Sequence, residues 1–298
     1  MRIFLTGATG FIGSEITREL LANGHKVLGL ARSDAGAEAL TAAGVDVQRG
    51  DLEDLDSLRS GAAAADGVIH TAFVHDFSRY MEAGEIEQRA VTALGDALAG
   101  SGKPLVITSG TAAVRSGVRA TEEMAGDPAS AGAARVAAET IVLELAQRGV
   151  RSAVMRLPPT VHDAGDHGFV PALIAIARQK GMSAYLGDGA NRWPAVNRKD
   201  AARLFRLAAE RAPAGTVLHA VAEEGLAFKD IAGAIASGLG VPVASVPVAD
   251  AAAQFGWLGK FVCVDNPTSS AATRQRFGWQ PTGPTLLEDL AQTDYFAG

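Results

Sequence analysis

The sequence predicts an α/β protein, in which a doubly wound parallel sheet is followed by a smaller C-terminal lobe. Three observations predict this class. A strand, a glycine-rich turn and a helix occupy the start of the chain, and strand-like apolar runs then alternate with alanine-rich helical stretches. This alternation ends at Pro158-Pro159. We therefore expect one domain over residues 1–160 and a lobe over residues 161–298, with about residues 190–222 returning to the sheet.

The opening segment, MRIFLTGATGFIG, has the form of a phosphate cradle. Arg2 to Leu5 is a strand-like run, and the periodicity of an amphipathic helix follows the turn. The first glycine permits a sharp turn, the second lets the backbone approach a pyrophosphate, and the third lets the helix pack closely on the strand. The helix N-terminus adds N–H groups and partial positive charge. The expected cofactor-binding residues here are Gly7, Thr9, Gly10, Phe11, Ile12 and Gly13.

Further strand-like runs follow the first helix. They are apolar on both faces and separated by helical stretches, which favours parallel pairing with right-handed crossovers. In such a sheet, ligands bind beyond the carboxyl ends of the strands. The expected strands are Lys26 to Ala31, Val45 to Gly50, Gly67 to Phe73, Pro104 to Gly110 and Arg151 to Leu157.

The second half of the chain has shorter elements and more turns, as is typical of a lobe that covers a substrate. A hairpin is expected over residues 183–196, and a returning strand over Thr216 to Glu224. The expected helices are Val170 to Lys180, Lys199 to Arg211, Ile231 to Gly238, Ala249 to Phe255, Ser269 to Phe277 and Leu286 to Tyr295.

Composition and charge indicate which kinds of partner the protein binds. Hydrophobic residues make up 48% and charged residues 20% of the 298 residues, so the chain can bury a large core. The net charge of −6 does not suggest a surface that binds nucleic acid or an anionic membrane. The single cysteine, Cys263, can form no internal disulfide, and the N-terminus carries no basic leader. We expect a cytoplasmic protein that binds small molecules.

The end of the second predicted strand indicates which dinucleotide binds. A carboxylate at this point holds the ribose hydroxyls of NAD and repels a 2′-phosphate. Here Arg32 and Ser33 occupy the point, and Asp34 follows. A guanidinium and a hydroxyl suit a phosphate, so NADP(H) is the expected cofactor. The alternative is that Arg32 is an ordinary exposed arginine.

The chain resembles an extended short-chain dehydrogenase/reductase, the class that includes nucleotide-sugar epimerases and dehydratases. The resemblance extends almost from end to end and implies a Rossmann domain, with a homodimer formed through the helices at 85–98 and 133–147. The matching segments are TGATGFIG at 6–13, GDLED at 50–54, VIHTAF at 68–73, VITSGTAAV at 106–114, RLPPTVH at 156–162 and DGANRWPAVNRKDAA at 188–202.

The resemblance also implies a path for the cofactor. Asp51 and Leu52 correspond to the pair that contacts the adenine, Thr71 and Ala72 to the pyrophosphate and ribose side, and Pro158 to the nicotinamide side. The alternative for Asp51 is a helix cap or a solvated strand-end carboxylate. Next to Thr71, His70 either contacts the cofactor or is satisfied by the backbone.

The acid/base motif of the family, Tyr-x-x-x-Lys, is absent. None of the three tyrosines has a lysine four residues later. ARVAAE at 134–139 resembles the family's SKAAAE, which places Arg135 at the lysine position and Ala131 at the tyrosine position. Arginine can hold a ribose and supply positive charge, but its pKa, above about 12, prevents it from shuttling protons. The resemblance is therefore closest to atypical members of the class.

The remaining candidates for catalysis are hydroxyl and imidazole groups. Thr111 corresponds to the Ser/Thr that hydrogen-bonds the substrate oxygen, and Ser109 lies nearby; the alternative for both is local capping where the strand ends. The missing proton donor is sought in His162, His75 or Tyr185, and His75 and Tyr185 are also expected to bind the substrate.

The segment 188–202 contributes the expected substrate contacts. Asn191, Arg192 and Trp193 lie in it, although Trp193 can equally brace the two lobes. No metal-ligand spacing and no nucleophile elbow occur in the sequence.

Taken together, these features predict an NADP(H)-dependent oxidoreductase that reduces a carbonyl of a small organic substrate. Two alternatives remain open: a nucleotide-sugar-type epimerase or dehydratase with internal redox, and a non-catalytic NADP-binding sensor.

Overall fold

The computed structural model describes residues 1–76, 79–291 and 295–296. Contacts divide the chain into two compact units. Unit 1 consists of Met1–Ser109, Ala133–Arg156 and Ala201–Leu218, and unit 2 of Gly110–Gly132, Leu157–Asp200 and His219–Gly298. Compared with the expected boundary at residue 160, the structure assigns 110–132 to unit 2 and 201–218 to unit 1.

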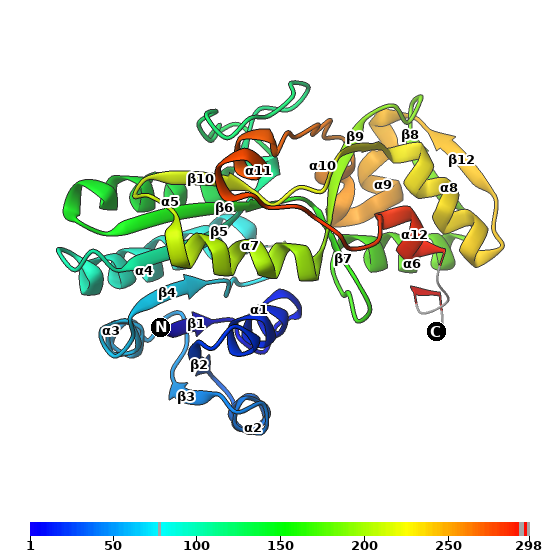
Figure 1. Ribbon diagram of the computed structural model, residues 1–298. Coiled ribbons are helices and arrows are strands. Elements are labelled where there is room, and N and C mark those ends of the chain that lie inside the picture. Colours follow the sequence, from blue (N-terminus) through cyan, green and yellow to red (C-terminus); the bar gives the residue numbers. More distant parts are fainter. Residues whose placement is uncertain (77–78, 292–294, 297–298) are drawn as a thin grey trace. The chain divides into compact units, whose positions relative to one another are not determined.

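Unit 1 contains a seven-stranded parallel sheet with the order β10-β6-β5-β4-β1-β2-β3, which confirms the predicted fold class (Figure 1). The order reverses between β1 and β4, and in doubly wound sheets this switch point is where ligands bind. The strands are β1 (Arg2–Thr6), β2 (Lys26–Ala31), β3 (Asp46–Arg49), β4 (Gly67–His70), β5 (Pro104–Gly110), β6 (Arg151–Leu157) and β10 (Thr216–His219).

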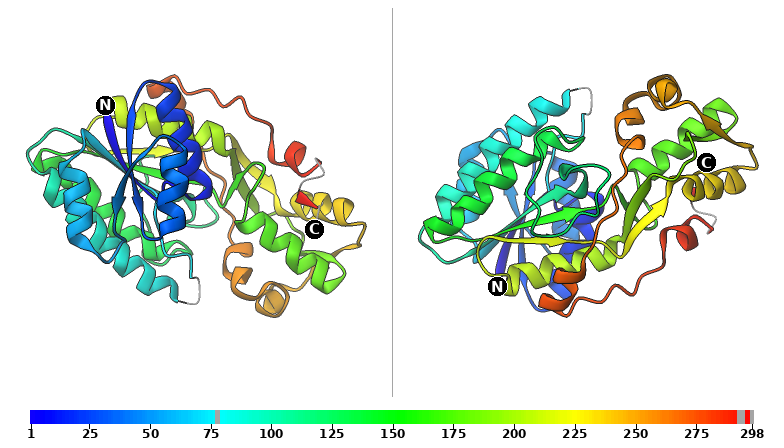
Figure 2. Two further views of the ribbon diagram at one scale, coloured as in Figure 1. Left: turned by 90° about the horizontal axis from the view of Figure 1, so that it is seen from below. Right: turned by 90° about the horizontal axis from the view of Figure 1, so that it is seen from above.

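Helices cover both faces of this sheet (Figure 2). Ile3, Phe4 and Leu5 of the central strand β1 are therefore fully buried on either side. On one face lie α3 (Leu55–Ala63), α4 (Tyr80–Leu98) and α5 (Ala133–Glu144), which contact one another in that order. On the other face are α1 (Phe11–Ala22), α2 (Asp34–Ala42) and α7 (Arg198–Arg211).

Two glycines allow α4 and α5 to approach closely. A Cβ on Gly84 would lie 2.5 Å from the carbonyl oxygen of Ala134, and one on Gly95 would lie 2.4 Å from Leu145 Cδ1. Leu145 begins the 3₁₀ turn η3 (Leu145–Arg148) that follows α5. Close contacts at these two levels, with the backbone of Ala134 and the side chain of Leu145, hold this helix pair in a defined register.

Unit 2 contains two small sheets. β9 (Arg192–Asn197) lies between β7 (Thr160–His162), with which it is parallel, and the antiparallel β11 (Glu223–Ala227). The second sheet pairs β8 (Ser183–Leu186) with β12 (Val243–Val246).

The prediction of a hairpin over residues 183–196 is wrong, because β8 and β9 belong to different sheets. Both edges of β9 are taken by β7 and β11, so β8 pairs with a strand that lies much later in the sequence. The expected strand Thr216 to Glu224 likewise divides into β10 and the first residues of β11, each in its own sheet.

The helices of unit 2 pack around an aromatic cluster. The ring centroids of Trp193 and Phe228 are 4.9 Å apart, as are those of Phe169 and Phe261. The helix expected over Leu286 to Tyr295 ends at Leu290, and residues 292–294 lie outside the described residues. The helical elements are η2 (Thr111–Ala113), α6 (Phe169–Lys180), α8 (Phe228–Leu239), η4 (Val248–Asp250), α9 (Ala251–Phe255), η5 (Gly256–Leu258), α10 (Gly259–Val262), α11 (Ala271–Phe277) and α12 (Leu286–Leu290).

None of the helices in the described ranges is long and apolar enough to cross a lipid bilayer.

Candidate functional site

The glycine turn after β1 has the geometry of a phosphate cradle. Gly7 has a φ of +70°, which favours glycine, and a Cβ on Gly13 would lie 2.0 Å from the Gly7 carbonyl oxygen. Gly10 precedes the first residue of α1, and among the described residues no side chain caps this helix N-terminus. Backbone N–H groups at an uncapped helix start suit a phosphate, so the residues fit a dinucleotide.

The ends of β1 and β4 are tied together beside this turn. Thr71 Oγ1 donates to the Thr6 carbonyl (2.8 Å), and the Ala72 N–H donates to Thr6 Oγ1 (3.3 Å). Thr6 Oγ1 also lies 2.8 Å from His70 Nδ1. A Cβ on Gly7 would lie 2.8 Å from the nitrogen of Ala72, so the two predicted contacts, Thr71 and Ala72, border the cradle.

His70 is fully buried, and its partner is a threonine hydroxyl rather than the backbone. Burial, with a smaller contribution from the positive charge of Arg135, lowers its pKa from 6.5 to about 3. The imidazole is therefore neutral at physiological pH. Its Nε2 is buried and has no hydrogen-bond partner in the described part of the chain.

At the carboxyl end of β2, two guanidinium groups are close to one turn. Ser33 caps α2 by accepting from the Gly36 N–H (3.2 Å), and the exposed Arg32 precedes it. Arg49, at the end of β3, donates to the Ser33 carbonyl (2.6 Å) and to Asp34 Oδ1 (2.7 Å). Sequence reasoning missed Arg49, because only the strand register, in which Ala31 is opposite Arg49, brings it to this point.

Asp51 and Leu52 form the turn after β3. Asp51 Oδ1 accepts from the N–H groups of Glu53 (2.8 Å) and Asp54 (3.0 Å), and Leu52 packs against the core. These contacts are those of a turn-forming carboxylate, which is close to the alternative interpretation of Asp51. Contact with the adenine stays a prediction for both residues.

Arg135 is the centre of a second cluster in unit 1. Its Nη1 lies 2.5 Å from Oε1 of the buried Glu87, and its guanidinium lies 4.0 Å from the centre of the Phe73 ring. The rings of His75 and Tyr80 pack edge-on against Phe73, with centroids 5.4 and 6.0 Å away. Burial raises the pKa of Glu87, and Arg135 opposes this effect.

Glu87, Phe73 and Tyr80 were not among the sequence candidates. They lie 48 to 62 positions before Arg135 in the chain, and no local pattern joins them to it. Glu87 holds Arg135 through an ion pair, and Phe73 does so through its ring. A cation–π contact of this kind contributes about 0.5–2 kcal/mol.

Ser109 has a structural partner. Its hydroxyl donates to Oε1 of Glu139 (2.5 Å), which also accepts from Arg156 Nε (3.0 Å). All three side chains are buried. The hydroxyl of Ser109 is thus engaged by a buried ion pair that joins β5, α5 and β6.

Thr111 is held by a partner that the sequence did not reveal. Its Oγ1 donates to Asn266 Oδ1 (2.5 Å), and Asn266 Nδ2 donates back to the Thr111 carbonyl (3.1 Å). Both residues are buried. A small pocket of unit 2 adjoins this pair and is lined by Ala112, Pro159, Trp193, Phe261, Val264 and Asn266.

The neighbouring candidates, Asn191 and Arg192, hold the segment that carries Asn266. Asn191 Nδ2 donates to the Val262 carbonyl (2.9 Å), and Arg192 forms a bidentate ion pair with Asp265 (3.0 and 2.8 Å). They position the wall of the pocket, whereas Trp193 lines it directly.

The remaining candidates are distributed over the two units. His162 is fully buried in β7, and its Nδ1 pairs with Asp289. Tyr185 packs on the turn after β8, where a Cβ on Gly189 would lie 2.7 Å from its ring. Pro158 follows β6 and is buried. Of the proposed proton donors, only His75 lies in the Arg135 cluster.

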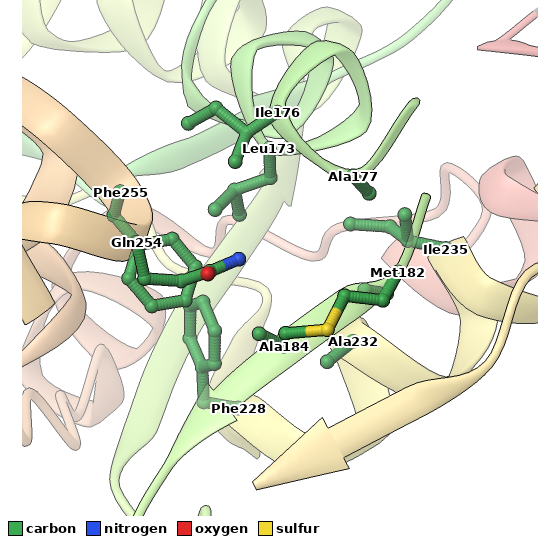
Figure 3. A pocket seen from close by; sticks show the side chains of 11 residues that line it. Leu173, Ile176, Ala177, Met182, Ala184, Phe228, Ala232, Ile235, Gln254 and Phe255 are labelled. Carbon is green, nitrogen blue, oxygen red and sulfur yellow. The ribbon is translucent and has the colours of Figure 1, made fainter. Parts of the chain in front are cut away.

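A second pocket lies within unit 2 between α6, α8, α9 and β8 (Figure 3). Its walls are almost entirely apolar, and the amide of Gln254 points into it, with a buried Nε2 that lacks a partner among the residues described. The free space admits about one water molecule. No group of three or more metal-ligating side chains occurs within the described residues.

The parallel sheet reverses its strand order between β1 and β4, and a glycine turn suited to a phosphate follows β1. These features define an NAD(P)-binding Rossmann protein of the extended short-chain dehydrogenase/reductase type. The sequence model of the NAD dependent epimerase/dehydratase family matches residues 3–220, and the chain belongs to this family.

Three comparisons show what the chain is similar to. It is 53% identical over 296 residues to an uncharacterized protein of Schizosaccharomyces pombe, which covers 99% of this chain and 100% of that protein. It is 29% identical over 259 residues to a 2-alkyl-3-oxoalkanoate reductase of Stenotrophomonas maltophilia, covering 81% and 77%. A dTDP-glucose 4,6-dehydratase of Streptomyces venezuelae, crystallised with NAD and TYD, shares the fold with a TM-score of 0.80 and 20% identity, over 99% of this chain and 96% of that chain.

Proposed function

We propose that the protein is an NADP(H)-dependent oxidoreductase that reduces a carbonyl group of a small organic substrate. The observation that carries the proposal is the pair of guanidinium groups, Arg32 and Arg49, at the ends of β2 and β3. Arg49 is paired with Asp34 at this turn, and Arg32 adds a second guanidinium group. Guanidinium groups suit a 2′-phosphate, whereas NAD is favoured by a carboxylate that holds the ribose hydroxyls. The similarity to a 2-alkyl-3-oxoalkanoate reductase supports carbonyl reduction.

The residues of unit 1 would hold the cofactor. The N–H groups at Gly10 to Gly13 would bind the pyrophosphate, with Thr71 and Ala72 beside them, and Arg32 and Arg49 would bind the 2′-phosphate. When bound, the reduced nicotinamide supplies a hydride.

Arg135 takes over two roles of the family's lysine. Its guanidinium can donate to a ribose hydroxyl and keep positive charge near the reacting groups. Glu87 and Phe73 restrict the guanidinium to one position, so little side-chain entropy is lost when it binds.

We assign Thr111 as the residue that hydrogen-bonds the substrate oxygen. Its hydroxyl can turn from Asn266 to donate to a carbonyl oxygen, and Asn266 keeps the threonine backbone in place through its Nδ2. The pocket beside this pair admits only about one water molecule, so it does not enclose a substrate. Its walls from Trp193, Pro159 and Phe261 make the surroundings of the pair apolar, which favours a substrate with an apolar part next to the carbonyl.

An epimerase or dehydratase with internal redox is the second candidate, because the family that matches is named for those activities. The experiment that separates the two is oxidation of NADPH, with NADH in parallel, by the purified protein against aldehydes, ketones, quinones and imines. Consumption with a preference for NADPH is the expected result. Tight binding of NADPH with no consumption across the panel would refute the reductase and leave the internal-redox enzyme or a sensor.

A further inference from the structure

We propose that Tyr80, in the first turn of α4, donates the proton in carbonyl reduction and so replaces the tyrosine that is missing from the segment before α5. This inference rests on the proposed reductase function and names a catalytic residue for it. Three independent features of unit 1 lead to it: the register of two helices, a shared aromatic ring and the charge of Arg135.

The register of α4 and α5 places Tyr80 at the correct level. Gly84 contacts Ala134 and Gly95 contacts Leu145, so the same offset, 84 to 134 and 95 to 145, holds along the pair. A constant offset means that the helices run parallel. Tyr80 therefore lies at the level where α5 begins, on the N-terminal side of Arg135.

That level is where the family motif requires its tyrosine. In Tyr-x-x-x-Lys the tyrosine stands about one helical turn before the basic residue. In this chain that turn holds no hydroxyphenyl group on the α5 side, because Ala131 stands four positions before Arg135. Tyr80 approaches the same level from the neighbouring helix.

Tyr80 also lies on the face of α4 that packs against α5. Tyr80, Gly84 and Glu87 are spaced i, i+4, i+7 and therefore share one side of the helix. Gly84 contacts the backbone of Ala134, and Glu87 pairs with Arg135.

The ring of Phe73 connects the tyrosine to the basic residue. Its centroid is 6.0 Å from that of Tyr80, in an edge-on arrangement, and the Arg135 guanidinium lies over the same ring at 4.0 Å. A tyrosine and a cation that both contact one ring are close enough for strong electrostatic coupling at a partly buried position.

The environment keeps Tyr80 protonated until a proton is needed. Burial raises the pKa of its hydroxyl, Arg135 lowers it, and Glu87 raises it. A neutral hydroxyl is the form that can donate, and Arg135 stabilises the tyrosinate that results. In the family motif, the positive charge of lysine stabilises the tyrosinate in the same way.

The carbonyl carbon gains a hydride from the reduced nicotinamide of the proposed function, and a C–H bond forms. The π pair of the C=O bond moves to the oxygen, which takes the hydroxyl proton of Tyr80 and becomes an alcohol. Water then returns a proton to the tyrosinate.

The test compares the wild-type protein with Tyr80→Phe, which keeps the ring contact with Phe73 and removes only the hydroxyl. Tyr295→Phe is the matched control, since it removes a hydroxyl that bonds to Asp163 and Asp166 in unit 2. NADPH affinity and Tm are measured for each, and kcat, KM and the pH profile are measured with a carbonyl that the wild type reduces.

For Tyr80→Phe we expect kcat to fall by about 10²–10⁴-fold, the loss typical of a missing general acid, with NADPH affinity and Tm unchanged. The alkaline limb of the kcat profile, which reports ionisation of the donor, should be lost. The charged groups that act on the hydroxyl are Arg135 on α5 and Glu87 on α4. His70 at the end of β4 is coupled to Arg135, and His75 packs against the ring of Phe73.

Retention of kcat and of the alkaline limb in Tyr80→Phe would overturn the role of Tyr80 while leaving the reductase intact. A lack of turnover by the wild type across the carbonyl panel would instead refute the proposed function itself. Equal losses in Tyr80→Phe and Tyr295→Phe would overturn the assignment, because they would reveal a general effect of removing a tyrosine hydroxyl.

Discussion

Arg49 is the residue whose replacement tests the cofactor assignment most directly. Its guanidinium is held at the end of β3 by the Ser33 carbonyl and the Asp34 carboxylate. In Arg49→Gln the charge is lost, while a polar side chain of similar reach remains. The 2′-phosphate distinguishes NADPH from NADH, so we expect the change to weaken NADPH binding alone.

The magnitude follows from the exposure of the group. A hydrogen bond to a charged partner contributes about 1.5–3 kcal/mol when it is shielded from water. The Arg49 side chain is 50% exposed and the Asp34 side chain is 92% exposed, so solvent screening reduces the value to about 1–2 kcal/mol. That corresponds to a loss of about 5–30-fold in affinity for NADPH.

The assay is a calorimetric or fluorescence titration of NADPH and of NADH at low and at moderate salt. Arg59→Gln is the matched control, because Arg59 is also an exposed arginine in an ion pair, with Asp56 on α3. NADPH affinity in the wild type should fall with ionic strength more steeply than NADH affinity. An equal loss for both dinucleotides, or no loss for NADPH, would contradict the assignment of a 2′-phosphate site to β2 and β3.

Two further predictions concern the cradle and the buried histidine. Gly13→Ala places a Cβ 2.0 Å from the Gly7 carbonyl, so it should abolish NADPH binding and lower Tm, whereas Gly233→Ala, with open space around it inside α8, should raise stability by about 0.4–1 kcal/mol in thermal denaturation. The pKa of His70 is about 3 in the folded protein and 6.5 ordinarily, so the unfolded chain binds a proton that the folded chain does not, and this contribution lowers the free energy of unfolding as the pH falls from about 6.5 to about 3. His70→Asn should flatten that pH dependence in urea titrations, and an unchanged slope would show that another group is responsible.

The parts of the fold that were predictable are those encoded by local signals. The glycine turn, the apolar runs and the helix periodicity each lie within a short window, and β1, β2 and α1 follow from them. The pairing of β8 was not predictable in this way. Its partner β12 begins 60 residues later, at Val243 opposite Ser183, and the turn glycines at 187 and 189 gave the false signal of a hairpin.

The same division applies to the candidate site. Arg32 and Gly7 could be found because their positions relative to a strand end define their roles. Arg49 required the register of β2 with β3, and Asn266 is separated from Thr111 by 155 positions. Such partners are determined by the tertiary structure, so no spacing in the sequence predicts them.

The replacement of lysine by arginine at position 135 has a consequence for the whole site. Glu87 is buried beside Arg135, so its carboxylate needs a permanent positive charge close by, and guanidinium supplies one at any physiological pH. A permanent cation can stabilise a tyrosinate but cannot relay a proton. If the protein is a reductase, the charge and the proton must therefore come from separate side chains, and α4 carries both Glu87, which fixes the charge, and Tyr80, which we assign to the proton.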